Sequence, residues 1–430
     1  MPFVPAIAFV TLGCPKNEVD SDRMAALVEA SAYRLVAEPA EADVVVLNTC
    51  SFIQAATEES IGETFSLVND WRPLRPGRRL VVAGCIVSRY GADLAESLPE
   101  PDAFLPVADE GSLLSLLEQL TGIPANAGAT TGRTHQGPTA YLKISEGCDR
   151  RCSYCAIPAI RGPFISADPD ELVAEARFLI AGGARELVLV GQDVASYGAD
   201  RPDFGDLAAL LKRLDALDGD FRLRLMYLQP DRVSDRLLAA IAASRRVCHY
   251  LDIPFQHAAG RVLRAMGRSG DAPGYLALVA RIRAVLPDAT LRTTVMAGFP
   301  GETEDDIAKL ESFLTQAGFD YTGVFAYSPE EGTIAASLEG HLPDEVREER
   351  AQRLRDIADT HGFARARARV GSMERVLVEG TEDGELYGRT CGQAPDVDGL
   401  TVLDCDAPIG EFVLVRITDA LGYDLVGEAQ

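Results

Sequence analysis

The sequence predicts an α/β protein with three consecutive folded parts. Short apolar runs alternate with helical patterns over roughly the first 340 residues, whereas the last 60 residues change to short β runs and turns. The length of 430 residues also exceeds what one ordinary hydrophobic core accommodates, and it suits two or three domains. We therefore expect two α/β parts followed by a small β part.

The first part, residues 1–122, is expected to hold an open parallel sheet. Three apolar runs, "AIAFVTLG", "ADVVVLNT" and "RRLVVAG", are separated by segments with helical patterns. This β-α-β-α-β rhythm predicts a parallel sheet with helices on its faces. Residues 123–138 are rich in Gly, Pro, Ala and Thr and lack periodicity, so we expect a linker there.

The second part, residues 139–342, is expected to be a partial TIM-type (β/α) barrel. Six strand-like runs recur with helices between them: "TAYLKISEG", "RELVLVGQD", "RLRLMYL", "HYLDIPF", "LRTTVMAGF" and "YTGVFAYS". Six such β-α units are typical of an incomplete barrel with parallel strands. The charged segment 343–370 predicts a connecting helix, and the β runs of 371–430 predict a small antiparallel β-barrel.

Composition and the first residues favour a cytoplasmic protein. Hydrophobic residues make up 47% of the chain, and no apolar run approaches the roughly 20 residues of a membrane span. No Lys or Arg precedes Cys14, so the start lacks the positive region of a lipoprotein signal. In the cytoplasm, the nine cysteines are expected to be metal ligands, catalytic groups or buried thiols rather than disulfides. Nothing indicates an obligate partner helix, and we expect a monomer.

The formal net charge of −24 disfavours general attraction to nucleic acid and favours a basic partner. Residues 371–430 hold thirteen acidic and three basic residues, a net charge of −10. The alternative interpretation is that this surface acidity only aids solubility. We expect no direct binding of nucleic acid.

The stretch "EGCDRRCSYCAIP", residues 146–158, places Cys148, Cys152 and Cys155 within eight residues. The next cysteine, Cys248, is 93 residues further on, whereas zinc sites usually use four protein ligands or paired cysteine knuckles. A [4Fe-4S] cluster takes one thiolate per iron, so three thiolates would leave one iron open to a small molecule. Three buried thiols without a metal are the alternative.

This Cys-x3-Cys-x2-Cys spacing, directly after the first predicted barrel strand, resembles the signature of the radical S-adenosylmethionine (SAM) enzymes. The barrel supports the resemblance, because active sites lie at the carboxyl ends of barrel strands. The resemblance implies that the open iron binds SAM, whose reductive cleavage yields a 5′-deoxyadenosyl radical. Tyr154, between two ligands, is expected to pack against the nucleoside or to shield the cluster.

Polar and glycine residues follow other predicted barrel strands: Gln192 and Asp193, Gln256 and His257, and Gly298 to Glu302. Gly298 would let the backbone approach a ligand closely, while Glu302 could instead serve as an acid at a helix N-terminus. We expect SAM to be contacted by Tyr154, Gln192, Asp193, Gly298 and Glu302. No catalytic residue is assigned beyond the cluster ligands.

Three further cysteines, Cys14, Cys50 and Cys85, each lie at the carboxyl end of a predicted strand of the first part. In an open parallel sheet these ends face one crevice, so the three thiols are expected to meet. We interpret them as ligands of a second [4Fe-4S] cluster with an open iron, the alternative being three small buried residues. Cys248, Cys391 and Cys405 show no such relation and are interpreted as structural.

Two facing clusters beside a radical SAM barrel and a C-terminal barrel like the TRAM domain resemble the methylthiotransferases over almost the full chain. One branch, MiaB-like, modifies an adenosine in transfer RNA. The other modifies an aspartate of small-subunit ribosomal protein number twelve. Four stretches resemble this second branch: "LDIPFQHA", "FAYSPEEGT", "APDVDG" and "YDLVG".

The resemblance implies a reaction that uses two SAM molecules per turnover. The first would donate a methyl group to sulfur at the cluster of Cys14, Cys50 and Cys85. The second would be cleaved at the cluster of the other three cysteines, and the radical would take hydrogen from the β-carbon of the target aspartate, which then accepts the methylthio group. An electron donor is implied as a partner.

Two departures from the family pattern do not involve a cluster ligand. Ala167 follows Ser166 where an arginine is usual, and "IVSRY" follows Cys85 where a glutamine-arginine pair is usual, although Arg89 remains. Arg161 could contact SAM or an acidic substrate group, or could pair with a structural carboxylate.

Two other functions stay open at this point. A tRNA adenosine methylthiotransferase would share both clusters and would differ in its substrate, which a basic groove would favour. A non-catalytic iron-sulfur protein would need the cysteines but no barrel site for SAM. The acidic charge favours the ribosomal protein as substrate, because a lysine- and arginine-rich protein would be steered toward it.

Overall fold

A computed structural model describes residues 3–126, 128, 132–135 and 137–429. The chain divides into two compact units. The first comprises residues 1–135, 146–150 and 155–165, and the second comprises 136–145, 151–154 and 166–430. Several residues of the predicted linker, 127, 129–131 and 136, lie outside the described residues. No helix in the described part of the chain is both long and apolar enough to cross a membrane.

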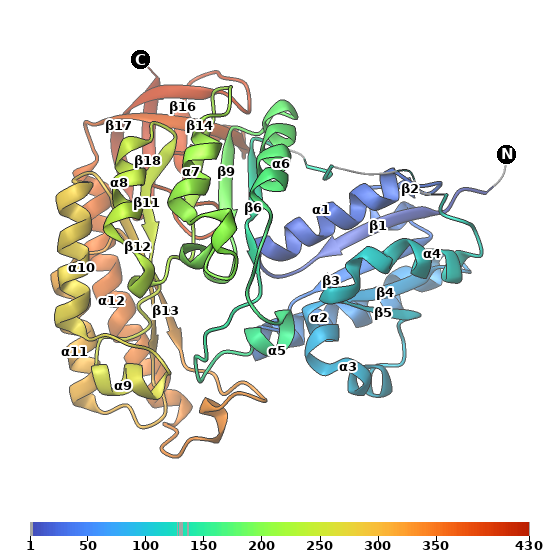
Figure 1. Ribbon diagram of the computed structural model, residues 1–430, viewed down its shortest axis with the longest axis horizontal. Coiled ribbons are helices and arrows are strands. Elements are labelled where there is room, and N and C mark those ends of the chain that lie inside the picture. The colour runs from blue at the N-terminus through green and yellow to red at the C-terminus, as the bar shows by residue number, and fades with distance from the viewer. Residues whose placement is uncertain (1–2, 127, 129–131, 136, 430) are drawn as a thin grey trace. The chain divides into compact units, whose positions relative to one another are not determined.

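The first unit contains a five-stranded parallel sheet, which confirms the predicted open α/β sheet (Figure 1). Its order is β2-β1-β3-β4-β5. The strands are β1 (Ala6–Thr11), β2 (Arg34–Leu35), β3 (Val44–Thr49), β4 (Arg79–Gly84) and β5 (Ala103–Pro106). The sequence predicted β1, β3 and β4 but not the two edge strands, because β2 has two residues and β5 ends at a proline.

Both faces of this sheet are buried. All six residues of β3 are buried, as expected where helices cover both sides of a parallel sheet. Separate hydrophobic clusters lie on the two faces, one around Leu47 and Leu80 and the other around Val46 and Val81. The helices are α1 (Pro15–Glu29), α2 (Gln54–Ser66), α3 (Cys85–Ser97), α4 (Leu113–Thr121) and the short α5 (Ile157–Arg161).

The second unit contains a six-stranded parallel sheet in the order β13-β12-β11-β10-β9-β6, which confirms the predicted partial barrel. The strands are β6 (Thr139–Lys143), β9 (Glu186–Val190), β10 (Arg222–Leu225), β11 (Val247–Asp252), β12 (Thr290–Ala297) and β13 (Tyr321–Ala326). Two further short strands are β7 (Ser145–Glu146) and β8 (Ile165–Ser166).

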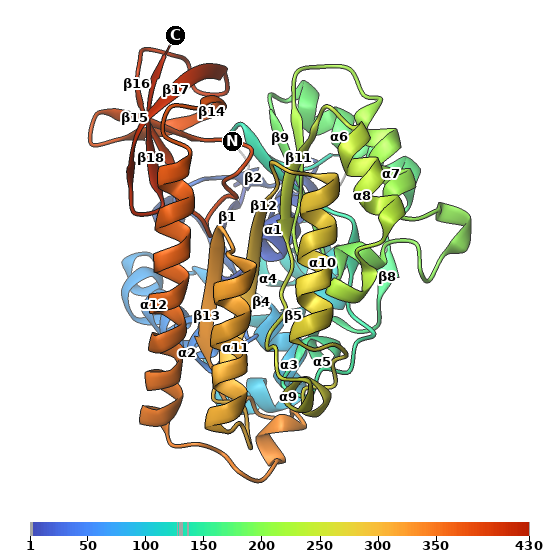
Figure 2. The same ribbon diagram turned by 90° about the vertical axis from the view of Figure 1, so that its left-hand side faces the viewer.

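Helices cover one face of this sheet, as Figures 1 and 2 show. They are α6 (Pro169–Ala181), α7 (Leu207–Asp215), α8 (Asp235–Ala243), α9 (Gly260–Ala265), α10 (Ala272–Val285) and α11 (Glu304–Ala317). Strand β12 alternates between buried and half-buried residues along its length, so Leu291 and Val295 pack into the core. Arg292 and Thr294 point to the opposite face, because successive side chains of a strand alternate.

Helix α12 (Asp344–Ala368) packs beside β13 and leads to the C-terminal barrel (Figure 2). The barrel is closed in the order β14-β15-β16-β18-β17, which confirms the predicted small β-barrel. Its strands are β14 (Met373–Glu382), β15 (Glu385–Arg389), β16 (Thr401–Asp404), β17 (Phe412–Leu421) and β18 (Asp424–Ala429). Gly362 lets the Tyr423 ring lie against α12, where a Cβ would overlap the ring, and the Tyr423 hydroxyl donates to Asp359 Oδ1 at 2.9 Å.

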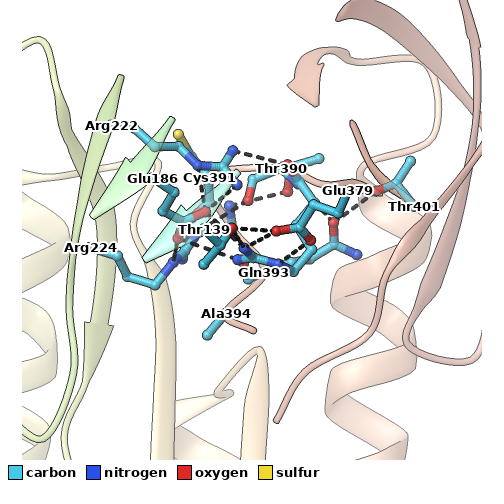
Figure 3. A network of polar contacts seen from close by, with 12 residues as sticks. Thr139, Glu186, Arg222, Arg224, Glu379, Thr390, Cys391, Gln393, Ala394 and Thr401 are labelled. Carbon is cyan, nitrogen blue, oxygen red and sulfur yellow. Dashed lines mark hydrogen bonds and ion pairs between the residues drawn. The ribbon is translucent and has the colours of Figure 1, made fainter. Parts of the chain in front are cut away.

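A buried carboxylate joins the C-terminal barrel to the parallel sheet (Figure 3). Glu186, the first residue of β9, is 0% exposed and accepts hydrogen bonds from Arg222 and Arg224 of β10 at 2.5 Å. Arg389, at the end of β15, reaches Glu186 at 3.0 Å and also binds Glu379 at 2.5 Å. The barrel therefore covers the amino-terminal edge of the sheet.

These charges compensate one another in a buried site. Burial opposes the charged form of Glu186, but the guanidinium groups of Arg222, Arg224 and Arg389 outweigh it and hold its pKa below the usual value. The stabilisation is therefore complete above the ordinary pKa of a glutamate and is lost as the pH falls through the depressed value. Arg224 also donates to the carbonyl oxygens of Thr390 and Cys391 at 3.2 and 2.8 Å.

Substitution of Glu186 by Gln would leave three buried guanidinium groups facing one another. We expect the apparent free energy of unfolding to fall by about 3–5 kcal/mol, because one partner of a buried ion network is removed. Urea denaturation followed by circular dichroism measures the loss. Glu349 is exposed, and its substitution by Gln should change stability by less than about 0.5 kcal/mol. Equal urea midpoints for the two variants would contradict this role of Glu186.

Candidate functional site

The three N-terminal cysteines follow neighbouring strands of the first sheet. Cys14 lies three residues beyond β1 and precedes α1, Cys50 directly follows β3, and Cys85 is the first residue of α3 after β4. Because β1, β3 and β4 are adjacent and parallel, all three residues lie at the same carboxyl edge. The sequence predicted this placement from the strand ends alone.

The three thiols also lie close to one another. Gly13 has a φ of 94°, and a Cβ at that position would stand 2.5 Å from Cys50 Cβ and 3.0 Å from its Sγ. Cys14 Sγ and Cys85 Sγ lie 4.0 and 3.7 Å from one oxygen, Asn17 Oδ1. Cys14 acts electrostatically on Cys50, and both act on Cys85. Three cysteines far apart in the chain therefore share one site.

The three thiols are the donor set that the sequence analysis predicted for a second [4Fe-4S] cluster, and this role stays a prediction. In the described part of the chain, no three His, Cys, Asp or Glu side chains surround one point as ligands of one metal ion would. A cube of four irons and four sulfides is larger than an ion, so its thiolates stand apart around it. The glycine at position 13 keeps the space beside Cys50 free of a side chain.

The positive charge of Arg161 opposes the effect of burial on the pKa values of the three thiols. Burial raises the pKa of Cys50 and raises that of Cys85 to about 12. Burial acts in the same direction on Cys14, but the charges of Lys16 and Arg161 outweigh it and lower the pKa of Cys14. Arg161 lowers the pKa of all three, and the thiolate is the form that binds iron.

Arg161, whose partner the sequence left open, pairs with carboxylates and with a cysteine. Its side chain is 1% exposed. Its Nη2 donates to Asp20 Oδ2 at 3.0 Å and to Cys85 Sγ at 3.6 Å, and its Nη1 donates to Glu146 Oε1 at 3.0 Å. The sequence analysis missed Asn17 and Asp20. The spacing could have indicated Asn17, because a residue three positions after Cys14 lies on the same side of the first turn of α1.

The second group of cysteines is divided between the two units. Cys148 and Cys155 belong to the first unit and Cys152 to the second. Cys148 is buried and its N–H donates to Gly162 O at 3.1 Å, within the first unit. In the second unit, the neighbour of Cys152, Ser153, is held by Ala265 O and Met266 O at 2.8 and 3.0 Å. The role of these three cysteines as cluster ligands stays a prediction.

Tyr154 is held by an arginine. Arg268 donates to the Tyr154 hydroxyl at 3.2 Å, to Gln229 Oε1 at 2.5 Å and to Pro254 O at 2.9 Å. The Tyr154 ring packs at the margin of the large hydrophobic core. The ring is thus fixed at the carboxyl end of the strands, where the sequence predicted a contact with SAM.

The other predicted contacts lie in loops after β9 and β12. Asp193 is buried and accepts from Ser196 Oγ at 2.8 Å, and Gln192 precedes it. The Glu302 carboxylate is 0% exposed and binds Gly298 N at 3.0 Å, His257 Nε2 at 3.1 Å and Arg350 Nη1 at 2.7 Å. The buried Glu302 carboxylate therefore fixes the conformation of the loop that begins at Gly298. Glu302 would affect SAM binding only indirectly, through the conformation of this loop.

Backbone strain marks the same edge of the sheet. Tyr227, after β10, and Gln256, after β11, adopt φ values of 60° and 68°, which side chains rarely do. Such strain is typical of functional sites. The sequence analysis named Gln256 as a polar residue after a strand, but it missed Tyr227. The residue type gives no indication that a non-glycine residue adopts a positive φ.

The structure pairs two cysteines that the sequence analysis treated as unrelated. Cys391, exposed in the loop after β15, and Cys248 of β11, which is 2% exposed, are near enough for each thiol to shift the pKa of the other. Contact with the Cys248 thiol and the charges of Arg222 and Arg224 lower the pKa of Cys391. Burial is the main cause that raises the pKa of Cys248. Cys405 packs at the margin of the C-terminal barrel core, in keeping with a structural role.

Three family models match the chain. Residues 6–106 match an uncharacterized protein family designated UPF0004, residues 142–314 match the radical SAM superfamily, and residues 370–429 match the TRAM domain. The resemblances to radical SAM enzymes and to the TRAM domain are thereby confirmed. The boundaries predicted between the parts stay predictions.

Curated relatives match over almost the whole chain. A protein of Nocardioides sp., named ribosomal protein uS12 methylthiotransferase RimO, is 41% identical over 98% of this chain and 96% of its own length. Proteins of the same name from Geobacter sulfurreducens and Desulforudis audaxviator are 40% and 43% identical, over 98% and 97% of this chain and 98% and 96% of their own lengths.

Solved structures share the fold at low identity. The radical SAM methyltransferase TsrM from Kitasatospora setae, with cobalamin and a [4Fe-4S] cluster bound, has a TM-score of 0.58 at 15% identity. The likeness covers 77% of this chain and 74% of TsrM. The cobalamin-dependent radical SAM enzyme OxsB, with aqua-cobalamin and SAM bound, has a TM-score of 0.52 at 12% identity, covering 83% of this chain and 56% of OxsB.

Substitution of Gly298 by Ala should disturb the loop after β12 more than the same change at Gly301. Both glycines have positive φ, 78° and 76°, so alanine costs about 1–2 kcal/mol at each. A Cβ at Gly298 would overlap the Arg347 side chain, whereas the nearest atom at Gly301 is Arg261 Nη1 at 3.9 Å. We expect an additional loss of about 1–3 kcal/mol for Gly298→Ala in urea denaturation. Equal losses would mean that Arg347 moves aside freely.

Cys391 should be alkylated faster than Cys405 at pH 7. The pKa of Cys391 is lowered, whereas burial and the charges of Asp404 and Asp406 raise that of Cys405, so Cys391 holds more thiolate. Iodoacetamide labelling followed by peptide mass spectrometry gives both rates in one sample. Cys248→Ala, which removes the thiol that lowers the pKa of Cys391, should slow labelling of Cys391 at pH 7. Equal rates for Cys391 and Cys405 at pH 7 would contradict this assignment.

Proposed function

This chain belongs to the RimO family of radical SAM methylthiotransferases, and on that premise we propose that it adds a methylthio group to the β-carbon of an aspartate of ribosomal protein uS12. We propose that two [4Fe-4S] clusters and two SAM molecules per turnover serve the reaction. The observation that carries the proposal is the meeting of Cys14, Cys50 and Cys85 at one edge of the first sheet, apart in sequence from the radical SAM motif. A radical SAM enzyme needs one cluster to cleave SAM, and a second set of three thiols implies a second task.

Cys14, Cys50 and Cys85 would hold the cluster that carries the transferred sulfur. Support comes from their shared sheet edge, from the space that Gly13 leaves beside Cys50, and from the positive charge of Arg161. Three protein thiolates leave one iron for a sulfur ligand. Asn17 and Arg161 lie beside the thiols, and both residues are buried.

Cys148, Cys152 and Cys155 would hold the cluster that binds SAM. When bound and reduced, that cluster with SAM supplies a 5′-deoxyadenosyl radical, which can take a hydrogen atom from an unactivated carbon. Tyr154, fixed by Arg268, would orient the nucleoside. Gln192 and Asp193 would offer polar groups at the end of β9, and Glu302 would keep the Gly298 backbone in place for close approach to the ligand.

The charge of the C-terminal barrel supports a protein substrate over RNA. Residues 371–430 carry a net charge of −10. Nine of the acids are exposed, so the charge faces outward: Glu382, Asp383, Glu385, Asp396, Asp404, Asp406, Glu411, Asp419 and Glu428. Such a surface would repel a phosphate backbone and attract a basic ribosomal protein. We propose a cytoplasmic monomer that receives electrons from a separate donor protein and binds no nucleic acid directly.

A competition assay tests the substrate and the two sites together. The anaerobically reconstituted protein receives SAM, reductant, uS12 and unmodified transfer RNA, and mass spectrometry follows both substrates and 5′-deoxyadenosine. We expect one methylthio group on an aspartate of uS12. Cys152→Ala should abolish deoxyadenosine, whereas Cys50→Ala should still form it but should transfer no methylthio group.

Cys405→Ala, which changes a cysteine outside both sites, should keep both products and serves as the control. A methylthio group on adenosine of the transfer RNA would replace the proposed substrate by RNA. Absence of deoxyadenosine from the iron-loaded protein would favour a non-catalytic iron-sulfur protein instead.

A further inference from the structure

We propose that Asn17 and Arg161 form a positioning pair for the N-terminal cluster, with Arg161 as the side-chain hydrogen-bond donor to the Cys85 sulfur. The inference rests on the proposed function, because it assumes that Cys14, Cys50 and Cys85 hold a cluster. It goes further by naming two residues that would set how easily this cluster is reduced and how long it keeps its iron. Neither residue would itself bind iron.

Asn17 is held in one orientation by the ends of two strands. Its Nδ2 donates to Leu12 O at 2.8 Å and to Thr49 O at 2.9 Å, and the residue is 0% exposed. Because both donors of the carboxamide are used, Oδ1 must point the other way. It points at Cys14 Sγ and Cys85 Sγ, at 4.0 and 3.7 Å.

Iron binding would change the hydrogen-bonding role of the cysteine sulfurs beside Asn17 Oδ1. A protonated thiol can donate to Asn17 Oδ1, but an iron-bound thiolate has no proton and can only accept. An oxygen acceptor facing two thiolates would then be unfavourable unless a donor stands beside it. Arg161 Nη2 is that donor, because it lies 2.6 Å from Asn17 Oδ1 and 3.6 Å from Cys85 Sγ.

The three cysteines receive their hydrogen bonds from different sources. The backbone N–H groups of Lys16 and Asn17 act to lower the pKa of Cys14, and those of Ser51 and Phe52 act to lower the pKa of Cys50. For Cys85, the side chain of Arg161 is a donor. Backbone donors are kept by the fold whatever the side chains, so the contact to Cys85 is the one that a single substitution removes.

Arg161 is itself fixed from both sides. Nη1 binds both oxygens of Glu146, at 3.0 and 3.1 Å, and Nη2 also binds Asp20 Oδ2 at 3.0 Å. A guanidinium offers five N–H donors in a rigid plane, whereas a lysine ammonium is a compact charge on a flexible stem. Lysine could therefore replace the charge of Arg161 but could not reach Asn17, Cys85 and both carboxylates together.

Hydrogen bonds and positive charge at cluster sulfurs stabilise the reduced form, which carries one more negative charge. Loss of Arg161 should therefore make the N-terminal cluster harder to reduce. Partners that orient metal ligands also matter for affinity, and their loss typically costs about ten- to hundredfold. We expect iron to leave the site about tenfold faster or more.

The test uses the full chain with Cys148, Cys152 and Cys155 all changed to Ala, so that only the N-terminal site can bind a cluster. In this background we compare Arg161 with Arg161→Gln and Arg161→Lys after anaerobic loading with iron and sulfide. Iron and sulfide content, the reduction potential from a titration followed by electron paramagnetic resonance, and the rate of iron loss to a chelator are measured.

Arg133→Gln is the matched control. Arg133 is also a buried arginine of the first unit, with a side chain 2% exposed, and it forms an ion pair with Asp22 at 2.6 Å. Arg161→Gln should shift the potential to more negative values and speed iron loss. Arg161→Lys should shift both in the same direction by less, and Arg133→Gln should leave both unchanged.

The outcomes separate this inference from the proposed function. If the parent with Arg161 binds no cluster, the proposed N-terminal site is wrong. If it binds one and the potential and rate of iron loss are the same in all Arg161 variants, the site stands and the positioning pair is wrong. If circular dichroism shows that Arg161→Gln does not fold, we compare Arg161→Lys with Arg133→Gln instead. A more negative potential and faster iron loss in Arg161→Lys alone would support the positioning pair, and equal values in the two variants would contradict it.

Discussion

The structure depends on one constraint, the parallel pairing of strands in both sheets. Parallel strands bring all their carboxyl ends to one edge, and the loops leaving that edge carry the polar and sulfur chemistry of the molecule. In the first unit this edge gathers three cysteines that are at least 35 residues apart in sequence. In the second it gathers Tyr154, Asp193, Tyr227, Gln256 and the glycine loop before α11.

The amino-terminal edge of the second sheet serves as the attachment site of the C-terminal barrel. There the C-terminal barrel is joined to β9 and β10 through the fully buried Glu186 and three arginines. Stability is thus concentrated at the amino ends of the strands and chemistry at the carboxyl ends, a division common in barrels. The acidic surface of the C-terminal barrel belongs to the same domain, so one small domain anchors the sheet and carries an exposed negative charge.

Much of this arrangement was predictable from sequence, and the reasons for the remainder are physical. Strand runs such as "ADVVVLNT" are buried on both faces, so their apolar character alone located them and the cysteines that follow. The edge strands β2 and β5 are too short to give a pattern. Two partners of Arg161, Asn17 and Asp20, come from a segment more than 100 residues earlier, and the neighbouring cysteines Cys248 and Cys391 belong to a barrel strand and to a loop of another domain. Such contacts depend on tertiary packing, which local periodicity does not encode.

The position of Arg161 has a consequence for biogenesis. The family match to the N-terminal domain ends at residue 106, and all three of its cysteines have been synthesised by then, yet the guanidinium that faces them is added 55 residues later. Until that point the Asp20 carboxylate, 1% exposed in the finished protein, lacks this counter-charge. The site is therefore assembled from two stretches of the nascent chain, and a fragment that stops before residue 161 carries the thiols without the electrostatic environment of the complete protein.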